Sequence, residues 1–172
     1  MNECYSYGMA DDLDLETLWN RNIDKNEGDE RWKRWKKEYI HYNHSDMGKT
    51  FIVRFEGVAV GEGTLLFSPD CKAIRGRKML ADGISVANVN ALRILRAFEG
   101  QGHISKMMKE LESYARARGY SELTIGVEAA ETRNLAIYLH WGYDRLVHAE
   151  MEDGVLVLYY AKSLKNKHHE ER

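Results

Sequence analysis

Proline and long hydrophobic runs are both scarce in this 172-residue sequence. Pro69 is the one proline, and no Ser/Gly-rich linker interrupts the chain, which argues against separate domains. We therefore expect a single domain over residues 1–164 and a charged, disordered tail over residues 165–172. No apolar stretch approaches the ~20 residues that a bilayer-spanning helix needs, so we predict no such helix.

Cysteine and net charge are also low. Cys4 and Cys71 match neither a metal-ligand spacing nor a disulfide framework, so we expect reduced thiols, with one disulfide left open. A formal net charge of -2 gives no overall electrostatic case for a nucleic-acid or anionic-membrane partner. Residues 1–15 are polar and acidic and lack a basic region followed by an apolar one, so we expect no signal peptide and a cytoplasmic protein.

Apolar periodicity and turn residues predict the order of the helices and strands. Helices are expected from Asp11 onward and over residues 30–42, 102–118 and 132–141; strands are expected over residues 50–54, 59–67, 85–95, 123–127 and 155–161. Glu56-Gly57 and Asp82-Gly83 are typical turn signals, and Gly119 is placed to end a helix. This order, with a β-α-β unit after a meander, predicts an α/β sandwich around a mixed sheet.

The segment Gly100-Gln101-Gly102-His103-Ile104-Ser105 leads from a predicted strand into an amphipathic helix. Two glycines let the backbone turn tightly, so that successive N–H groups can face one concavity. The N-terminus of a helix adds a partial positive charge and unpaired donors. The pattern therefore predicts a site for phosphates, with a plain strand-to-helix turn as the alternative.

Other phosphate-binding motifs do not fit this loop. The sequence contains no Gly-x-x-x-x-Gly-Lys-Ser/Thr run, which excludes a Walker A loop. A dinucleotide-binding fingerprint needs a third glycine at a fixed spacing, whereas Ile104 and Ser105 follow Gly102. A pyrophosphate-bearing cofactor of another kind is the better match.

Two motifs occur together in the second half of the chain. The strand end Leu92-Arg93-Ile94 leads into Gly100-Gln101-Gly102, and farther on comes Tyr138-Leu139-His140-Trp141-Gly142-Tyr143. They resemble two motifs of the GNAT superfamily of acyl-CoA-dependent N-acyltransferases. These are a hydrophobic-x-Val strand end before a Gly-x-Gly/Ala loop, and a later Tyr-x-x-x-Gly-Phe. The pair is more specific than either motif alone, and the resemblance extends over about residues 50–160.

The resemblance implies an α+β fold with a mixed, mostly antiparallel sheet flanked by helices and a β-α-β unit that binds acetyl-CoA. The residues that match the family's cofactor site are Leu92, Ile94, Gly100, Gln101, Gly102, His103, Ile104, Ser105 and Asn134. The His103 side chain is expected to donate to phosphate or to face solvent. Glu99 stands where Arg or Gln is usual, and Ile104 where a small residue is usual, so we expect altered contacts to the cofactor.

By the same resemblance, an acetyl group passes directly from acetyl-CoA to an amine. A free alkyl amine with a pKa near ~10 is protonated at neutral pH, so a base must remove its proton. The backbone N–H of Ile94 matches the family's donor to the developing oxyanion. Tyr138 matches the family's proton donor to the departing thiolate, although without that match it is an ordinary surface aromatic.

The general base is the least defined part of the expected site. Asn88 stands where the family often has a carboxylate, and an amide cannot accept the proton. Glu62, Asp82 and Glu128 are the alternatives, acting directly or through water, although each could be a plain surface carboxylate. We favour Glu62, which lies on a strand expected to face the acceptor.

A stripe of aromatic residues marks the second predicted helix. Trp32 and Trp35 lie on one helical face with Tyr39 and Tyr42, and this stripe forms either core or the wall of an acceptor pocket. We assign Trp32 and Trp35 to acceptor binding, because in this family the first two helices commonly border that site. The interleaved basic residues at 31–37 are best explained as a solvated face, with binding of an acidic partner as the alternative.

The sequence is consistent with three functions. The favoured one is an acetyl-CoA-dependent N-acetyltransferase, an acyltransferase whose amine acceptor is a small molecule in preference to a protein. The second is a GNAT-fold sensor or scaffold that binds acyl-CoA without catalysis. The third is an interaction module that works through its tryptophan-rich helix. The oligomeric state stays open, with a homodimer among the alternatives.

Overall fold

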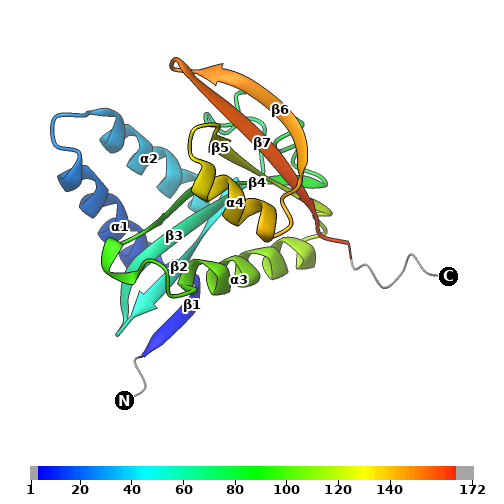
Figure 1. Ribbon diagram of the computed structural model, residues 1–172. Helices are drawn as coiled ribbons and strands as arrows, with labels where there is room; N and C mark the ends of the chain where they lie inside the picture. The colour runs from blue at the N-terminus through cyan, green and yellow to red at the C-terminus, as the bar shows by residue number, and fades with distance from the viewer. Residues whose placement is uncertain (1–3, 166–172) are drawn as a thin grey trace. The chain divides into compact units, whose positions relative to one another are not determined.

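The computed structural model describes residues 4–165, and within them the chain forms seven strands and four α-helices (Figure 1). The strands follow the hydrogen-bonded order β1-β2-β3-β4-β5-β7-β6. Pairing is antiparallel in β1–β2, β2–β3, β5–β7 and β6–β7, and parallel in β4–β5. The expected mixed, mostly antiparallel α/β fold is confirmed. No helix among these residues is long and apolar enough to cross a bilayer.

The chain divides into two compact units, and the division passes through β4 (Val86–Ile94) and α3 (His103–Ala117). Unit 1 comprises the described residues up to Leu66 together with Ala91–Leu111. Unit 2 comprises Phe67–Asn90 and the described residues from Glu112 onward.

Unit 1 begins with a strand and two helices and continues into a hairpin. Its elements are β1 (Tyr5–Met9), α1 (Asp12–Lys25), α2 (Arg31–His44), β2 (Gly48–Phe55), β3 (Val58–Leu66), the end of β4, the short 3-10 helix η1 (Arg96–Phe98) and the start of α3. Helix α1 starts where the sequence predicts, because Asp11 and Asp14 exchange side-chain-to-backbone hydrogen bonds of 2.8 Å in a capping box. Glu56 and Gly57, with φ of 49° and 81°, form the predicted β2–β3 turn.

The core of unit 1 contains apolar residues of α1, β2 and β3. Leu18, Ile52 and Ala59 pack together and are at most 3% exposed. Tyr39 and Tyr42 of α2 are also buried, whereas Trp32 and Trp35 of the same stripe are half-buried. The aromatic stripe is therefore core at its C-terminal end and open to solvent at its N-terminal end.

Unit 2 contains the start of β4, the end of α3, β5 (Glu122–Glu128), α4 (Thr132–His140), β6 (Arg145–Glu152) and β7 (Val155–Ser163). Val86–Val89 of β4 pair in parallel with residues 122–125 of β5. Gly126 of β5 admits the Tyr159 ring of β7, because a Cβ there would lie 2.8 Å from Tyr159 Cε1. Gly119, with φ of 91°, ends α3 as expected.

The sequence prediction missed β1 and β6, and it located the other strands and the helices to within a few residues. Cys4 and Cys71 are both free thiols, as predicted. Most of the charged tail, residues 166–172, lies outside the described residues.

Candidate functional site

The predicted phosphate loop connects β4 to α3 within unit 1. Gly100 and Gly102 have φ of 73° and 82°, in the left-handed region that glycine adopts without strain. A Cβ at either position would have no atom within 4 Å, so glycine is needed for the backbone path and not for space. Helix α3 begins at His103, and the first N–H groups of an α-helix have no acceptor within it. These unpaired donors suit an anion.

His103 points into unit 1 and not into solvent. Its Nδ1 lies 2.9 Å from the Tyr7 hydroxyl and its Nε2 lies 3.0 Å from Gln101 Oε1. The ring stacks on Tyr5 with centroids 4.1 Å apart, and the residue is 6% exposed. The expectation that the His103 side chain faces solvent is wrong. Both ring nitrogens of His103 have protein partners, so His103 has only its backbone N–H left for phosphate, whereas the Gln101 amide still has a donor N–H group.

The strand before the loop bends where the two units divide. Ala91 has φ of 54°, a left-handed conformation that interrupts the extended backbone of β4, as bulges near functional sites do. After it, the Leu92 side chain extends over Gly63 of β3, where a Cβ would lie 2.8 Å from Leu92 Cδ1. Ile94 similarly approaches Gly61, 3.3 Å from a Cβ there. These two glycines let the expected cofactor strand lie close against β3.

Glu62, the favoured base, forms an ion pair with Arg93 of β4. Glu62 is 3% exposed, and its Oε1 lies 2.7 Å from Arg93 Nη2. The Arg93 guanidinium lies 5.2 Å from the ring centroids of both Trp19 in α1 and Trp32 in α2. Both are cation–π contacts. The alternative that Glu62 is a surface carboxylate is wrong. Among the described residues, no hydrogen bond is made to its second oxygen, Oε2.

Trp35 extends the aromatic group that contains Trp32. The two rings meet edge to face with centroids 5.0 Å apart, and Arg31 lies 5.5 Å from the Trp35 centroid. Trp32 and Glu62 thus contact Arg93, and Trp35 packs against Trp32. The contact between Arg93 and Glu62 was not predicted. The one signal for it in the sequence is that Arg93 is a charged residue between two apolar residues of a strand.

The basic run of α2 is largely neutralised by nearby carboxylates. Arg31 pairs with Asp29 at 2.8 Å, and Lys36 pairs with Glu16 at 2.6 Å. In the same run, Lys33 pairs with Glu30 and Arg34 pairs with Glu38. Arg31, Lys33 and Arg34 are more than half exposed, which confirms a solvated face.

Tyr138 and Asn134 lie on α4, in unit 2. Burial, and after it repulsion from Glu131, raises the pKa of Tyr138 above its ordinary value, so the hydroxyl stays protonated at neutral pH. The ring lies 5.8 Å from that of Trp141. Asn134 is exposed, and its side chain donates to Glu131 at 2.9 Å.

The Tyr-x-x-x-Gly-Tyr motif ends in a buried polar cluster. Tyr143 is fully buried, and its hydroxyl donates to Glu112 at 3.2 Å. Lys162 also donates to Glu112, at 3.0 and 2.9 Å. Burial, followed by the charge of Glu112, raises the pKa of Tyr143. The hydroxyl of Tyr143, which stands where the family usually has phenylalanine, thus has a buried hydrogen-bond acceptor in Glu112, and the Lys162 ammonium lies over its ring.

Asp82 and Glu128, the alternative bases, have different surroundings. Asp82 accepts hydrogen bonds of 2.8 to 2.9 Å from the N–H groups of Ile84, Ser85 and Val86. Burial acts to raise the pKa of Asp82, but these hydrogen bonds outweigh it and lower that pKa. Asp82 therefore holds a turn, while Glu128 is exposed. Asn88 is buried and donates to Thr124 at 3.0 Å.

The predicted site residues thus fall into two groups. Unit 1 holds the loop 100–105, Leu92, Ile94, Glu62, Trp32 and Trp35, whereas unit 2 holds Tyr138 and Asn134. The chemistry available within unit 1 is anion binding by a glycine loop and helix N-terminus beside a strand with a buried carboxylate. Unit 2 supplies a phenol that is protonated at neutral pH.

Comparison with known families identifies this arrangement. The Acetyltransferase (GNAT) family matches residues 13–143, so the chain belongs to the GNAT acetyltransferases. No curated protein is significantly similar in sequence.

Solved structures share the fold at low sequence identity. An N-acetyltransferase from Staphylococcus aureus Mu50 is 14% identical, with a TM-score of 0.67 over 94% of this chain and 99% of that one. A Salmonella typhimurium acetyltransferase that modifies the N-terminal serine of ribosomal protein L7/L12 is 14% identical, with a TM-score of 0.69 over 96% and 97%. A GNAT acetyltransferase from Elizabethkingia anophelis with acetyl-CoA bound is 12% identical, with a TM-score of 0.58 over 92% and 97%.

Proposed function

We propose that this protein is an N-acetyltransferase that transfers an acetyl group from acetyl-CoA to the primary amine of a small molecule. Membership of the GNAT family makes acyl transfer the general expectation. The observation that carries the proposal is the left-handed backbone of Gly100 and Gly102 directly before α3, the geometry a pyrophosphate needs.

The loop fits acetyl-CoA through its backbone. The N–H groups of residues 100–105 are the proposed pyrophosphate donors, and both ring nitrogens of His103 already have protein partners. Leu92 and Ile94 supply the strand along which the thioester arm extends, and Asn134 is a further proposed contact. Acetyl-CoA supplies the activated acetyl group, and the protein supplies the alignment.

Three groups of the chain carry the proposed chemistry. The Ile94 N–H donates to the oxyanion that develops on the acetyl carbonyl. The Tyr138 hydroxyl, which is protonated at neutral pH, gives its proton to the departing thiolate. Glu62 Oε2 accepts the proton of the amine, either directly or through one water.

The ion pair with Arg93 orients Glu62, which favours a defined geometry for proton transfer from the amine.

Trp32 and Trp35 are the proposed acceptor contacts. Both are half-buried aromatic residues; Trp32 contacts Arg93 of the Glu62 ion pair and Trp35 packs against Trp32, so they can cover the apolar part of an organic amine. A small acceptor is favoured over a protein because the adjacent basic residues of α2 are neutralised within the chain and give no strong charged docking surface.

Release of free CoA from acetyl-CoA, measured against a panel of amines, tests the proposal. The wild-type protein is expected to turn over at least one small amine. Tyr138→Phe and Glu62→Gln should each lower kcat by about 10²-fold, the lower end of the usual contribution of acid–base groups. Glu128→Gln, which alters an exposed carboxylate, is the matched control and should keep wild-type kcat.

Different outcomes separate the alternatives. If the protein binds acetyl-CoA but releases no CoA with any amine of the panel, the result would favour the alternative function of a non-catalytic acyl-CoA sensor. Unchanged kcat in Tyr138→Phe would show that the proton donor is misassigned.

A further inference from the structure

The guanidinium of Arg93, in unit 1, uses little of its hydrogen-bonding capacity. Its Nη2 donates to Glu62 Oε1 at 2.7 Å, and this is its one hydrogen bond among residues 4–165. Nε is buried without an acceptor. Nη1 has no acceptor among the same residues, although the side chain as a whole is 32% exposed. A guanidinium carries five N–H groups, and polar groups inside proteins normally have partners, so this shortfall needs an explanation.

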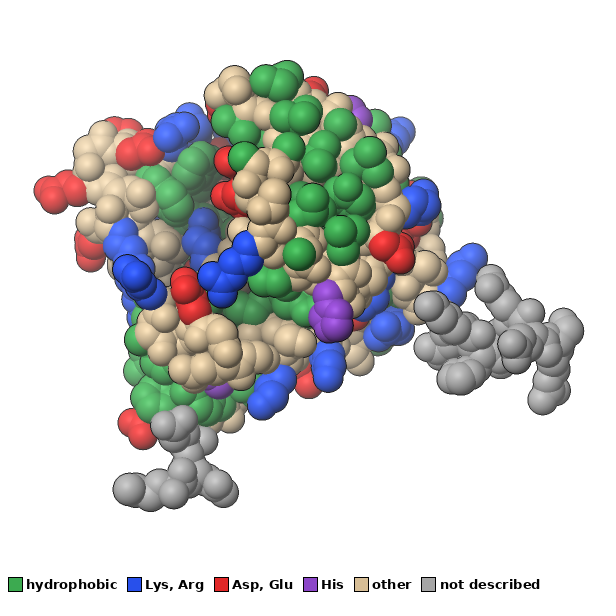
Figure 2. All heavy atoms as spheres, in the orientation of Figure 1, with side chains coloured by type: hydrophobic (Ala, Val, Ile, Leu, Met, Phe, Trp, Pro, Cys, Tyr) green, Lys and Arg blue, Asp and Glu red, His purple; other side chains and the backbone are tan. Residues whose placement is uncertain are grey.

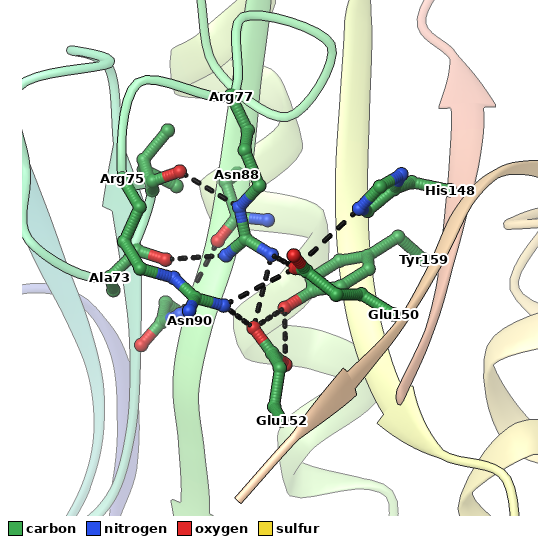
Figure 3. Close-up of polar contacts among 10 residues, drawn as sticks. Ala73, Arg75, Arg77, Asn88, Asn90, His148, Glu150, Glu152 and Tyr159 are labelled. Carbon is green, nitrogen blue, oxygen red and sulfur yellow. Dashed lines mark hydrogen bonds and ion pairs between the residues drawn. The ribbon is translucent and has the colours of Figure 1, made fainter. Parts of the chain in front are cut away.

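Arg77, in unit 2, shows what a guanidinium with complete hydrogen bonds looks like (Figure 3). Its Nε and Nη2 each donate to a backbone carbonyl oxygen at 2.9 Å. Its Nη1 lies 2.6 Å from Glu150 Oε2 and 3.0 Å from Glu152 Oε1. All three nitrogens bind groups of the protein, as expected of an arginine that stabilises the fold. Arg93 lacks this arrangement, and departures of that kind are typical of functional sites.

The β6–β7 hairpin of unit 2 does not suit a small charged ligand. Figure 2 shows hydrophobic side chains gathered over β6 and β7. Leu146 and Met151 of β6 are 53% and 63% exposed. A charged group that settled there would lose water without gaining a partner, which is unfavourable. The open guanidinium of Arg93 is the better site for a charged group.

The groups beside Arg93 define what it can bind. Glu62 balances the guanidinium through Oε1, while Oε2 accepts no hydrogen bond from the residues that the structure describes. The rings of Trp19 and Trp32, with centroids 5.2 Å from the guanidinium, hold it in place. The site therefore presents an open cationic group and an open anionic oxygen next to each other.

A simple amine would complement only half of this site. Its ammonium matches Glu62, but the neighbouring guanidinium repels it and gains no partner. An α-amino acid carries both charges, with the ammonium nitrogen about 3 Å from the carboxylate because only two carbon atoms separate them. That spacing matches the 2.7 Å between Glu62 Oε1 and Arg93 Nη2. We propose that the acceptor is a free α-amino acid, whose carboxylate binds Arg93 and whose amine lies against Glu62. The inference rests on the proposed acetyltransferase function.

The corresponding reaction balances without a further reactant. The α-ammonium group first loses one proton, and the nitrogen lone pair then forms a bond to the acetyl carbon. The C–S bond of acetyl-CoA breaks with its electron pair on sulfur. The nitrogen loses a second proton as the amide forms, and the thiolate takes up one. The products are an N-acetyl amino acid, the CoA thiol and one proton. Arg93 binds the carboxylate throughout and takes no part in proton transfer.

Matched sets of acceptors test the proposal on the wild-type protein. Each amino acid with a primary α-amine is compared with its amide and with the amine that lacks the carboxylate. Because a carboxylate–guanidinium contact is charge-assisted, kcat/KM for the favoured amino acid should exceed that of its amide and its amine by about 10- to 100-fold. The amide also resembles the N-terminus of a peptide, so a preference for the amide would refute the proposal and indicate a protein acceptor.

Arg93→Lys separates carboxylate recognition from stability. Lysine keeps a positive partner for the buried Glu62 but lacks the planar fork of donors, so the preference for amino acid over amine should fall at least about tenfold. A loss of stability alone would lower both activities and leave their ratio unchanged, and that result would overturn the proposal. Arg54→Lys is the matched control. Arg54 also pairs with a buried carboxylate in unit 1, that of Asp14, and this variant should keep the wild-type ratio.

Calorimetric titration in the presence of CoA separates failure of this proposal from failure of the proposed function. At least one amino acid should bind, and its decarboxylated amine should bind at least about tenfold more weakly. Release of CoA with amines, but without any preference for amino acids, would reject the amino acid acceptor and leave acetyl transfer intact. Selective binding of amino acids without release of CoA would support the site at Arg93 and contradict acetyl transfer. No binding of any amino acid would reject the site.

Discussion

Arg93 and His103 are two polar residues whose partners lie far away in the sequence. Arg93 meets Glu62 across 31 positions, and His103 meets Tyr7 across 96. Local sequence predicts neither contact, because neither residue type specifies a distant partner. The glycines at 100 and 102 were predictable, since the need for a left-handed backbone is local. At this scale the sequence indicated the loop's backbone role and missed what its side chains bind.

Tyr159 gives a prediction for alkaline pH. Burial, together with the hydrogen bond to Glu152, raises the pKa of Tyr159 to about 12. Because the folded protein favours the protonated phenol, this contribution to stability is complete below pH ~10 and is lost as pH rises from ~10 to ~12. The loss is at most about 3 kcal/mol, since one pKa unit corresponds to about 1.4 kcal/mol.

Urea unfolding of wild type and Tyr159→Phe, measured from about pH 9 to about pH 12, checks this prediction. The variant should be less stable than wild type at the lower pH, because it lacks the hydrogen bonds to Glu152. Its unfolding free energy should then fall less steeply with pH. Parallel curves for the two proteins would contradict the assignment.

The helices and strands differ in how far local sequence determined them. Helix α1 carries a capping box at Asp11, and α3 ends at Gly119, so both ends have local signals. Strand β1 was missed because it is five residues long and contains Gly8. Strand β6 was missed because it mixes charged and exposed apolar residues. An edge strand that depends on pairing for its stability has a weak local pattern.

Strand β5 gives a prediction at the scale of the element. Gly126→Ala would place a Cβ 2.8 Å from Tyr159 Cε1 and 3.2 Å from Cδ1, and an aromatic ring in a buried site cannot bend away. The substitution should lower the unfolding free energy by about 1–3 kcal/mol, the usual cost of overpacking.

Gly8→Ala is the matched control for that change. Gly8 also lies in a strand, but a Cβ there would have no atom within 4 Å. Its unfolding free energy should stay within about 0.5 kcal/mol of wild type. Equal stability of the two variants in urea would refute the close approach of β5 to Tyr159.

At the scale of the molecule, the family was accessible from the sequence. Two linked motifs indicated a GNAT fold, and the family match over residues 13–143 confirms it, although the structures compared above are only 12–14% identical. The acceptor was not accessible, because it depends on side chains such as Trp32 and Arg93 that the tertiary structure brings together. The motifs describe the part of the site that all members share.

The central claim is that the loop 100–105 binds acetyl-CoA through its backbone, and calorimetric titration tests it most directly. Gly102→Ala would strain a backbone at φ of 82°, while Gly154→Ala strains a turn at φ of 79° on the β6–β7 hairpin and is the matched control. Wild type and Gly154→Ala should bind one acetyl-CoA per chain with similar affinity, and Gly102→Ala should bind at least about tenfold more weakly, a difference of about 1.4 kcal/mol. No binding by the wild-type protein at millimolar acetyl-CoA, or equal binding by all three, would contradict the account.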